Sequence, residues 1–266
     1  MSGGAFDSMA AGYDDEFTNS QIGRLQRDKV WDYLDSNFRF SKNFRVFELN
    51  CGTGEDAIRL AKRGCKVVAT DISPEMIDVA RNKAEKAGVS DHIEFKTLNL
   101  DKVKSADFVG EFDLIFSNFG GLNCVSRSTL EILQKVFATS LSPQGRFIAV
   151  VMPTACMMES LYFLSRFQIG NAFRRGKKKV EWKNEIGEAL MIHYYSPKEF
   201  AEPFEENFTS DQQVPVGLWV PPSYTEAFFQ RHNRTLNVLA SLEQHLSPSF
   251  LAGIADHYLI DLKLKN

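Results

Sequence analysis

The chain has 266 residues, of which 44% are hydrophobic and 24% charged, as is typical of a soluble globular protein. This length permits one large domain or a domain with an elaborate insertion. The net charge of −3 excludes a global basic field of the kind that binds nucleic acid, and no apolar run is long enough to cross a membrane.

Four widely spaced cysteines form no C-x-x-C pair: Cys51, Cys65, Cys124 and Cys156. This spacing favours reduced thiols in a cytoplasmic protein over a zinc site or a disulfide framework. The start of the sequence, Met1–Gly4, shows no basic segment followed by an apolar run, so we expect no signal peptide.

Residues 1–43 predict a helical cap ahead of the first strand. Apolar residues recur at about helical spacing from Phe6 to Phe17, and again from Ile22 to Leu34. We expect the second of these helices to pack on a sheet.

Residues 44–61 predict a strand, a glycine turn and the start of a helix. Phe44–Leu49 is apolar and β-prone, as a buried strand is. The turn follows at Cys51–Gly54, and apolar residues at helical spacing begin after Glu55. These elements form the ligand-binding corner of an open α/β sheet. Glycines there let the backbone approach a ligand, and the helix start offers free N–H groups.

Two carboxylates accompany this turn. A second strand, Cys65–Thr70, is followed by Asp71. An acidic residue about 20 residues past a glycine-rich turn suits hydrogen bonding to a ribose diol. Glu48 lies beside the turn, and carboxylates here also favour a ligand that carries positive charge.

The two motifs together resemble those of the class I S-adenosylmethionine-dependent methyltransferases. Glu48–Gly54 has the family's acidic residue, two further positions and Gly-x-Gly turn, and Asp71–Met76 has its Asp-x-Ser-x-x-Met pattern. The pair at this spacing is specific, whereas the first motif alone also fits a loose dinucleotide fingerprint. The resemblance is strongest over residues 44–152. It implies a Rossmann-like α/β fold: a seven-stranded, mostly parallel sheet with an antiparallel last strand and helices on both faces.

The resemblance also implies S-adenosylmethionine as the cofactor and indicates the residues that bind it. They are Tyr13, Glu48, Asn50, Cys51, Gly52, Thr53, Gly54, Asp71, Ile72, Met76, Asn99, Leu100, Asn118 and Phe119. Asn99 and Leu100 follow a third strand and are expected beside the adenine, whose edge an Asn amide can serve. Ala10–Asp14 resembles a segment that folds over the cofactor in many small-molecule members. The alternative is that Tyr13 merely packs on its helix.

The next elements continue a strand–helix alternation, which favours a parallel sheet. Ser73 is a good N-cap for a helix that stops at Gly88. The remaining expected elements are strands at Ile93–Leu98, Phe112–Ser117 and Arg146–Met152, a helix at Leu130–Leu141 and a turn at Pro143–Gly145. The loop that starts at Asn118 should lie between cofactor and acceptor, beyond the carboxyl ends of the strands. Alternatively it is a mobile glycine turn, with Asn118 as a helix cap.

Beyond residue 152 the regular alternation stops. We expect residues 153–195 to form a lid insertion of apolar helices and a β-hairpin, Val180–Tyr195, that turns near Asn184–Gly187. Residues 196–266 complete the core and contain a helical insertion at about 221–250. Within them we expect a capping box at Ser196–Glu199, strands at Gln213–Val220 and His257–Lys263, and a helical stretch at Tyr224–Leu246.

Methyl transfer from a sulfonium is an in-line displacement, so the protein mainly aligns the acceptor, excludes water and removes a proton where necessary. The candidate general bases are His193, at the end of the hairpin, and His232, on the second helical insertion, because histidine suits deprotonation of a phenol or amine. Alternatively His193 is a strand surface residue and His232 lies on an amphipathic helix. The other histidines, assigned to the surface or to packing, are His92, His245 and His257.

Aromatic residues are frequent in the second half of the chain. They include Phe163, Phe167, Phe173, Trp182, Trp219, Tyr224, Phe228 and Phe229. Since small-ligand pockets are mostly apolar, we expect an apolar or aromatic acceptor under the lid, although these residues also suit a core or a dimer interface. The basic run Arg174–Lys179 is typical of a solvated loop; otherwise it attracts an anionic acceptor, a carrier protein or a membrane surface.

The sequence thus predicts a cytoplasmic methyltransferase, monomeric or homodimeric, with a small-molecule acceptor, no nucleic-acid partner and no metal. Three alternatives remain: an NAD(P)-dependent oxidoreductase, a non-catalytic S-adenosylmethionine-binding protein and a protein methyltransferase. The Asp71–Met76 motif and the position of Glu48 argue against the oxidoreductase.

Overall fold

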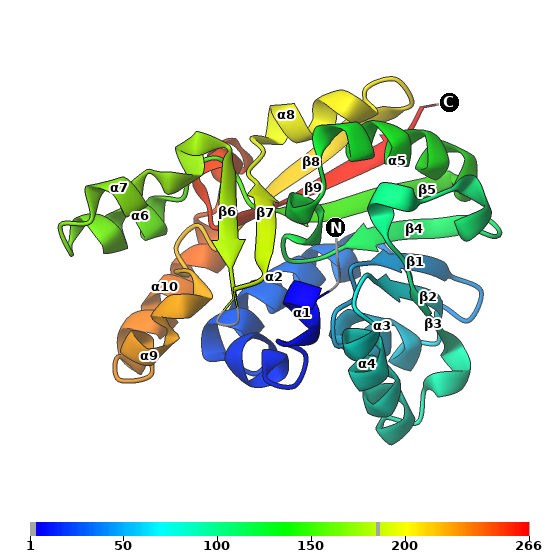
Figure 1. Cartoon of the computed structure of the whole chain (residues 1–266), viewed down its shortest axis with the longest axis horizontal. Helices are drawn as coiled ribbons and strands as arrows, with labels where there is room; N and C mark the ends of the chain where they lie inside the picture. The colour runs from blue at the N-terminus through cyan, green and yellow to red at the C-terminus, as the bar shows by residue number, and fades with distance from the viewer. Residues whose placement is uncertain (1–3, 185–186, 266) are drawn as a thin grey trace.

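The computed structural model describes residues 4–184 and 187–265 and is built around a seven-stranded sheet (Figure 1). The strand order is β3-β2-β1-β4-β5-β9-β8. The strands are β1 (Arg45–Leu49), β2 (Lys66–Asp71), β3 (Ile93–Thr97), β4 (Phe112–Ser117), β5 (Leu141–Val151), β8 (Phe208–Val216) and β9 (His257–Leu264). Strands β1 to β5 pair in parallel, whereas β9 runs antiparallel to both β5 and β8. This confirms the predicted Rossmann-like fold with its antiparallel last strand.

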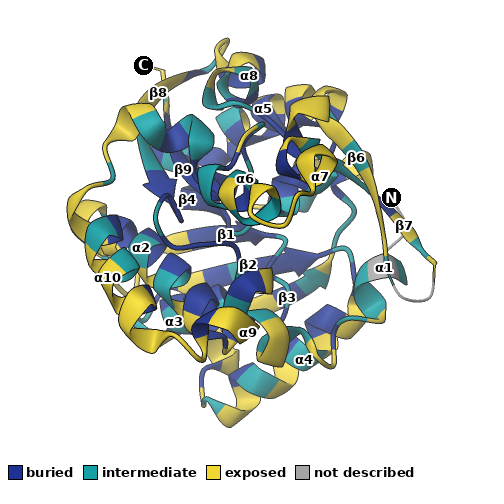
Figure 2. Ribbon diagram, turned by 90° about the vertical axis from the view of Figure 1, so that its left-hand side faces the viewer, coloured by how far each residue is buried: buried dark blue, intermediate teal, exposed yellow. Residues whose placement is uncertain are grey.

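Helices cover both faces of the sheet. The cluster on one face joins α2 (Gln21–Asn37), α3 (Glu55–Lys62) and α4 (Pro74–Lys86) to the sheet; the cluster on the other joins it to α5 (Arg127–Ser140) and α8 (Pro197–Ala201). Strand β1 serves both clusters because its side chains alternate: Val46 belongs to the first, and Phe47 and Leu49 to the second. Figure 2 shows the consequence, a buried sheet between helices whose outer surfaces are exposed.

Helix starts and ends form where the local sequence predicts them. The Ser73 side chain accepts a hydrogen bond from the Met76 amide at 3.1 Å, and Ser196 and Glu199 form the predicted capping box at the start of α8. Gly88, just past the end of α4, has a φ of +67°, a left-handed conformation that glycine adopts without strain.

Other boundaries differ from the prediction. The sixth strand begins at Phe208 instead of Gln213, because β8 is an edge strand whose exposed Thr209 and Asp211 hide its pattern. The expected turn at Pro143–Gly145 lies within the longer β5, at a register shift against β4. The N-terminal pattern yields α1 (Gly4–Asp7) and a π-helical turn, Asp14–Thr18. The stretch expected as one helix over Tyr224–Leu246 is divided into α9 (Glu226–Phe229) and α10 (Asn233–His245).

The segment between β5 and α8 stands beside the carboxyl edge of the sheet (Figure 1). It contains α6 (Met157–Leu164), α7 (Ile169–Ala172) and an antiparallel hairpin of β6 (Lys179–Lys183) and β7 (Ala189–His193). Near the hairpin end, Asn184 Nδ2 donates to Ser8 Oγ at 3.1 Å, which ties it to the N-terminal segment. The predicted turn at Asn184–Gly187 includes residues 185–186, which lie outside the described residues. None of the described helices is both long and apolar enough to cross a membrane.

Candidate cofactor and active site

A cavity of about 250 Å³ opens at the carboxyl ends of the parallel strands. Its polar wall comes from the loops after β1, β2 and β4, and its apolar wall from the N-terminal segment and the β6–β7 hairpin. The lining residues are Phe6, Met9, Tyr13, Asn50, Gly52, Asp71, Ile72, Met76, Leu98, Leu100, Asn118, Phe119, Gly120, Gly121, Cys124, Val125, Met152, Trp182, Leu190 and Ile192. The cavity therefore brings together nine of the residues predicted to bind the cofactor.

The glycine turn after β1 forms the floor. Gly52 has a φ of +52°. The space beside its Cα is open, because a Cβ added there would have Tyr13 Cε1, 3.9 Å away, as its nearest neighbour. Gly54 has a different reason to be glycine: a Cβ there would lie 2.8 Å from Ala80 Cβ, so Gly54 allows α3 and α4 to approach closely. Gly54 does not line the cavity.

Asp71 holds the turn and faces the cavity. Its carboxylate accepts hydrogen bonds from the Gly52 amide at 2.9 Å and from the Ser73 amide at 3.0 Å. Burial raises the pKa of Asp71, although these amide hydrogen bonds oppose the shift. A carboxylate has about four lone-pair sites, so capacity remains for a ligand.

Glu48 is a second carboxylate, in a narrow polar recess next to the cavity. It is 1% exposed, and its Oε2 has no hydrogen-bond partner within the described ranges. Burial, followed by the nearby Asp56 carboxylate, raises the pKa of Glu48 well above its usual value. A buried acceptor without a partner is rare and costly, so this oxygen suits a hydrogen-bond donor or cation from a ligand.

The same recess contains an anchored ion pair. Asp56 pairs with Arg27 and accepts hydrogen bonds from Trp31 Nε1 at 2.7 Å and Asn118 Nδ2 at 2.9 Å. Burial alone would raise the pKa of Asp56, but the Arg27 guanidinium outweighs it and lowers the pKa. Asn118 is thus fixed by Asp56 at the point where the β4 loop meets the cavity.

Tyr13 reaches the cavity, as predicted for a segment folding over the site. Burial raises the pKa of its phenol to about 12, so the hydroxyl remains protonated at neutral pH. Thr53 and Cys51 line the polar recess instead of the main cavity, and Thr53 Oγ1 donates to Asp14 Oδ1 at 2.6 Å.

Asn99 is not among the described residues that line the cavity. Its side-chain oxygen accepts from the Asp101 amide at 2.9 Å and caps the short 3₁₀ turn Leu100–Lys102. The neighbouring Leu98 and Leu100 do line the cavity and present an apolar surface. The position expected beside the adenine is therefore apolar in character, because the asparagine is used as a cap.

The two histidines predicted as bases do not line the cavity either. Leu190 and Ile192 of β7 face it, and side chains alternate along a strand, so His193 lies on the opposite face. There burial and the nearby Lys179 lower the pKa of His193. His232 is exposed at the start of α10, and its Nδ1 lies 2.8 Å from the Phe228 carbonyl. The geometry gives neither residue access to the cavity.

The basic run predicted as a solvated loop is partly buried, which corrects that expectation. Arg175 is 4% exposed and binds Glu159 at 2.9 Å and Asp256 at 2.7 Å, while Arg174 binds Glu159 at 3.0 Å. Two guanidiniums of the run are thus used inside the protein, because buried carboxylates far away in sequence pair with them.

The roof of the cavity comes from the segments predicted as N-terminal cap and lid, but apart from Trp182 its individual residues were not assigned to the site. Phe6, Met9, Trp182, Leu190 and Ile192 all face the cavity. The available signal was the alternation of apolar residues along the hairpin. It indicates which residues share a face but not where that face docks.

Residues 46–145 match the model of a methyltransferase domain family. Over this part the chain is similar to the class I S-adenosylmethionine-dependent methyltransferases. It is 34% identical over 92 residues to a tRNA 5-carboxymethoxyuridine methyltransferase of Escherichia coli (strain K12), a match that covers 34% of this chain and 35% of that protein. It is 33% identical over 112 residues to a demethylmenaquinone methyltransferase of Thermus thermophilus, covering 41% of this chain and 47% of the relative. The chain therefore matches less than half the length of these family members.

Solved structures extend the likeness to the whole fold. A DhpI–SAH complex superposes with a TM-score of 0.62 at 16% identity, covering 98% of this chain and 94% of that one. A methyltransferase from Clostridium acetobutylicum superposes with a TM-score of 0.59 at 14% identity, covering 91% and 92%. At this identity the likeness shows the shared fold alone.

Proposed function

We propose that this protein transfers a methyl group from S-adenosylmethionine to a small apolar or aromatic molecule. The observation that carries the proposal is the unpartnered Glu48 Oε2, buried beside the glycine turn and one recess away from Asp71. The amino-acid end of the cofactor offers an ammonium group to Glu48, and the ribose offers two hydroxyls to Asp71. Ile72, Met76 and Leu100 supply an apolar surface for the adenine.

The bound cofactor supplies an activated methyl group on a sulfonium. The protein's part is to hold the acceptor in line and to keep out water. Tyr13 and Asn118 border the cavity near the glycine turn, and the hairpin and N-terminal segment close over it. This arrangement supports a reaction under a roof, away from bulk solvent.

The character of the roof supports an apolar acceptor. Phe6, Met9, Met152, Trp182 and Ile192 present apolar side chains to the cavity. The family includes tRNA methyltransferases as well as enzymes such as the demethylmenaquinone methyltransferase. A tRNA acceptor needs an exposed cationic surface, and the pairing of Arg174 and Arg175 with Glu159 weakens the basic run as such a surface.

Calorimetric titration tests the cofactor part of the proposal. S-adenosylmethionine and S-adenosylhomocysteine should bind the wild-type protein, and NADH should not. Asp71→Ala should weaken both sulfur nucleosides at least tenfold, because two ribose hydrogen bonds are lost. Preference for NADH would overturn the assignment.

A panel of acceptors tests the substrate class. Radiolabelled methyl transfer should reach phenolic, quinone-like or lipidic acceptors. Turnover with polar amines or with tRNA, and none with the apolar compounds, would contradict the proposed class while leaving the cofactor assignment intact.

A further inference from the structure

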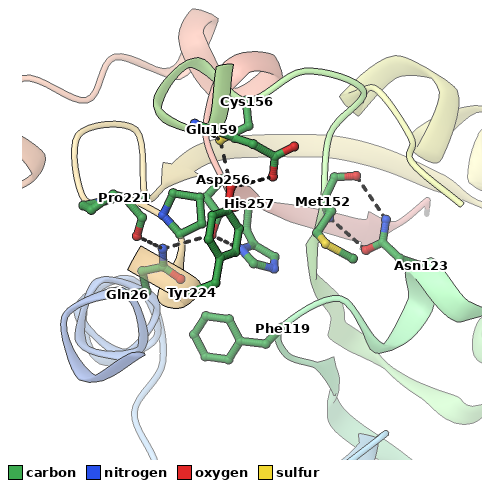
Figure 3. A network of polar contacts seen from close by, with 12 residues as sticks. Gln26, Phe119, Asn123, Met152, Cys156, Glu159, Pro221, Tyr224, Asp256 and His257 are labelled. Atoms are coloured by element: carbon green, nitrogen blue, oxygen red, sulfur yellow. Dashed lines mark hydrogen bonds and ion pairs between the residues drawn. The ribbon is translucent and has the colours of Figure 1, made fainter. Parts of the chain in front are cut away.

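A histidine that was not among the predicted bases lies next to the loop that follows β4. His257 is the first residue of β9, and because β9 is antiparallel, this residue lies at the edge where β1 and β4 end. It is 8% exposed, and its ring lies perpendicular to that of Phe119 with 5.6 Å between centroids. Figure 3 shows His257 directly above Phe119 and across from Met152.

One side of the imidazole faces a carboxylate. His257 Nδ1 lies 3.3 Å from Asp256 Oδ2, an ion-pair contact without hydrogen-bond geometry, and among the described residues Nδ1 has no hydrogen-bond partner. That carboxylate is itself fixed, since Oδ2 accepts from Gln26 Nε2 at 3.0 Å and Oδ1 accepts from Arg175 Nη2 at 2.7 Å. Burial alone would raise the pKa of Asp256, but His257 and Arg175 hold it well below its usual range. Asp256 therefore remains charged and favours a proton on Nδ1.

The other nitrogen faces the wall of the cavity. A Cβ added to Gly120 would lie 3.7 Å from His257 Nε2, 3.5 Å from Asn123 Oδ1 and 3.1 Å from Met152 Cε. Gly120 and Met152 both line the cavity, whereas His257 lies directly behind them and is not itself among the described lining residues. Over the part of the chain that the structure describes, no hydrogen bond satisfies Nε2. The atom thus lies behind a glycine with no side chain and a flexible methionine.

We propose that His257 is the general base of the methyl transfer and that Asp256 is its positioning residue. As the bond from the acceptor oxygen or nitrogen to the methyl carbon forms, the carbon–sulfur bond breaks and its electron pair stays on sulfur. His257 Nε2 takes the proton that the acceptor atom releases. The acceptor is therefore a molecule whose reacting atom carries a proton, such as a phenol. This assignment rests on the proposed function.

The surrounding charges favour this role. Asp256 faces His257 from the same strand end, Arg175 faces Asp256 from the loop before β6, and Glu159 faces Arg175 from α6. Tyr224 Oη donates to Glu159 Oε2 at 3.2 Å, and Cys156 Sγ lies 4.0 Å from Asp256 Oδ1. Arg27 lies over the Phe119 ring, 5.0 Å from its centroid. The carboxylate nearest the imidazole stabilises the imidazolium that forms when Nε2 takes a proton.

The first test needs no acceptor. Nitrogen-15 NMR of histidine-labelled wild-type protein, with and without S-adenosylhomocysteine, reports which imidazole nitrogen carries the proton. His257 should carry it on Nδ1, which leaves Nε2 as the acceptor. A proton on Nε2 in both states would overturn the proposal. His257→Gln assigns the resonances.

The second test measures turnover with the acceptor panel. His257→Gln should lower kcat at least 100-fold. Its affinity for S-adenosylhomocysteine should stay within threefold of wild type. His245→Gln, at an exposed histidine, is the control and should not lower kcat. Asp256→Asn should lower kcat about tenfold and move the acid limb of the pH–rate profile to lower pH, because the imidazolium loses its carboxylate. Unchanged turnover in His257→Gln, or loss in His193→Gln or His232→Gln instead, would refute the assignment. Loss of cofactor binding in the wild type would refute the proposed function instead.

Discussion

At the scale of single residues, the most informative group is a carboxyl that is poorly placed for stability. Glu48 is buried at the end of β1, and its pKa is raised well above the usual value because burial, Asp56 and other carboxylates disfavour its charge. A carboxyl with a raised pKa in the folded state contributes stability below about pH 4, and this contribution is lost as the pH rises. Such a residue is retained at a cost, which suits a binding role.

We therefore predict opposite effects of Glu48→Gln on stability and binding. The free energy of unfolding at pH 8 should rise by about 1 kcal/mol, because a buried carboxyl that is costly to ionise becomes neutral. S-adenosylmethionine affinity should fall about tenfold with the loss of a charge-assisted hydrogen bond. Urea unfolding and calorimetry measure the two quantities.

Glu94→Gln is the matched control for this prediction. Glu94 lies on β3 of the same sheet with its side chain 61% exposed, and it pairs only with Lys96 among the described contacts. Its substitution should change neither quantity appreciably. A lower free energy of unfolding for Glu48→Gln, together with unchanged S-adenosylmethionine affinity, would show that Glu48 has a structural role.

At the scale of elements, β1, the glycine turn and the start of α3 could be predicted because their signals are local. Phe112–Ser117 is a strand in both prediction and structure. Ser73 caps α4 through a contact three residues away. Patterns of period two and 3.6 act over this range and need no knowledge of the tertiary fold.

The rest of the site could not be predicted, because long-range packing decides it. Asn99 suits an adenine edge by type, yet the structure uses it to cap a turn. His193 and Ile192 are neighbours in sequence, but strand alternation turns only Ile192 to the cavity. His257 reaches Phe119 only because β9 is inserted between β5 and β8. Nothing in its local sequence indicates that arrangement.

We expect only the cavity-facing side of the β6–β7 hairpin to slow ligand dissociation. Trp182 lines the cavity, while Glu181, its neighbour, points to the opposite face. Trp182→Ala should speed dissociation of S-adenosylhomocysteine about tenfold, since it removes apolar contact area from the roof. Stopped-flow dissociation of a fluorescent analogue measures this rate.

Glu181→Ala provides the comparison from the other face of the hairpin. It should leave the dissociation rate within twofold of wild type. The melting temperature should change little in either variant, because both side chains are at least 36% exposed. Equal effects of the two substitutions would show that the hairpin does not close the site through this face.

At the scale of the whole molecule, one buried ion network ties the segment after β5 to the core. Glu159 of α6 and Asp256 beside β9 are 97 residues apart, and Arg175 binds both at less than 3 Å. Arg175 and both carboxylates are buried. Burial alone would raise the pKa of both carboxyls, but Arg174 and Arg175 lower the pKa of Glu159, and His257 and Arg175 lower that of Asp256. The position of the lid segment and the rigidity of the strand end that carries His257 therefore depend on the same guanidinium.

We predict that Arg175→Met lowers the free energy of unfolding at pH 7 by about 3 kcal/mol, because it leaves two buried carboxylates without their shared partner. Arg174→Met should cost less than about 1 kcal/mol, since Arg174 is half-exposed and binds only the Glu159 end of the network. Carboxylates with lowered pKa values stabilise the fold above their unfolded pKa, and this stability is lost as the pH falls below about 4. The difference between wild type and Arg175→Met should accordingly shrink as urea unfolding is repeated from about pH 5 to about pH 2. A difference that stays constant across this range would mean that Arg175 stabilises the protein by packing and not by its charge.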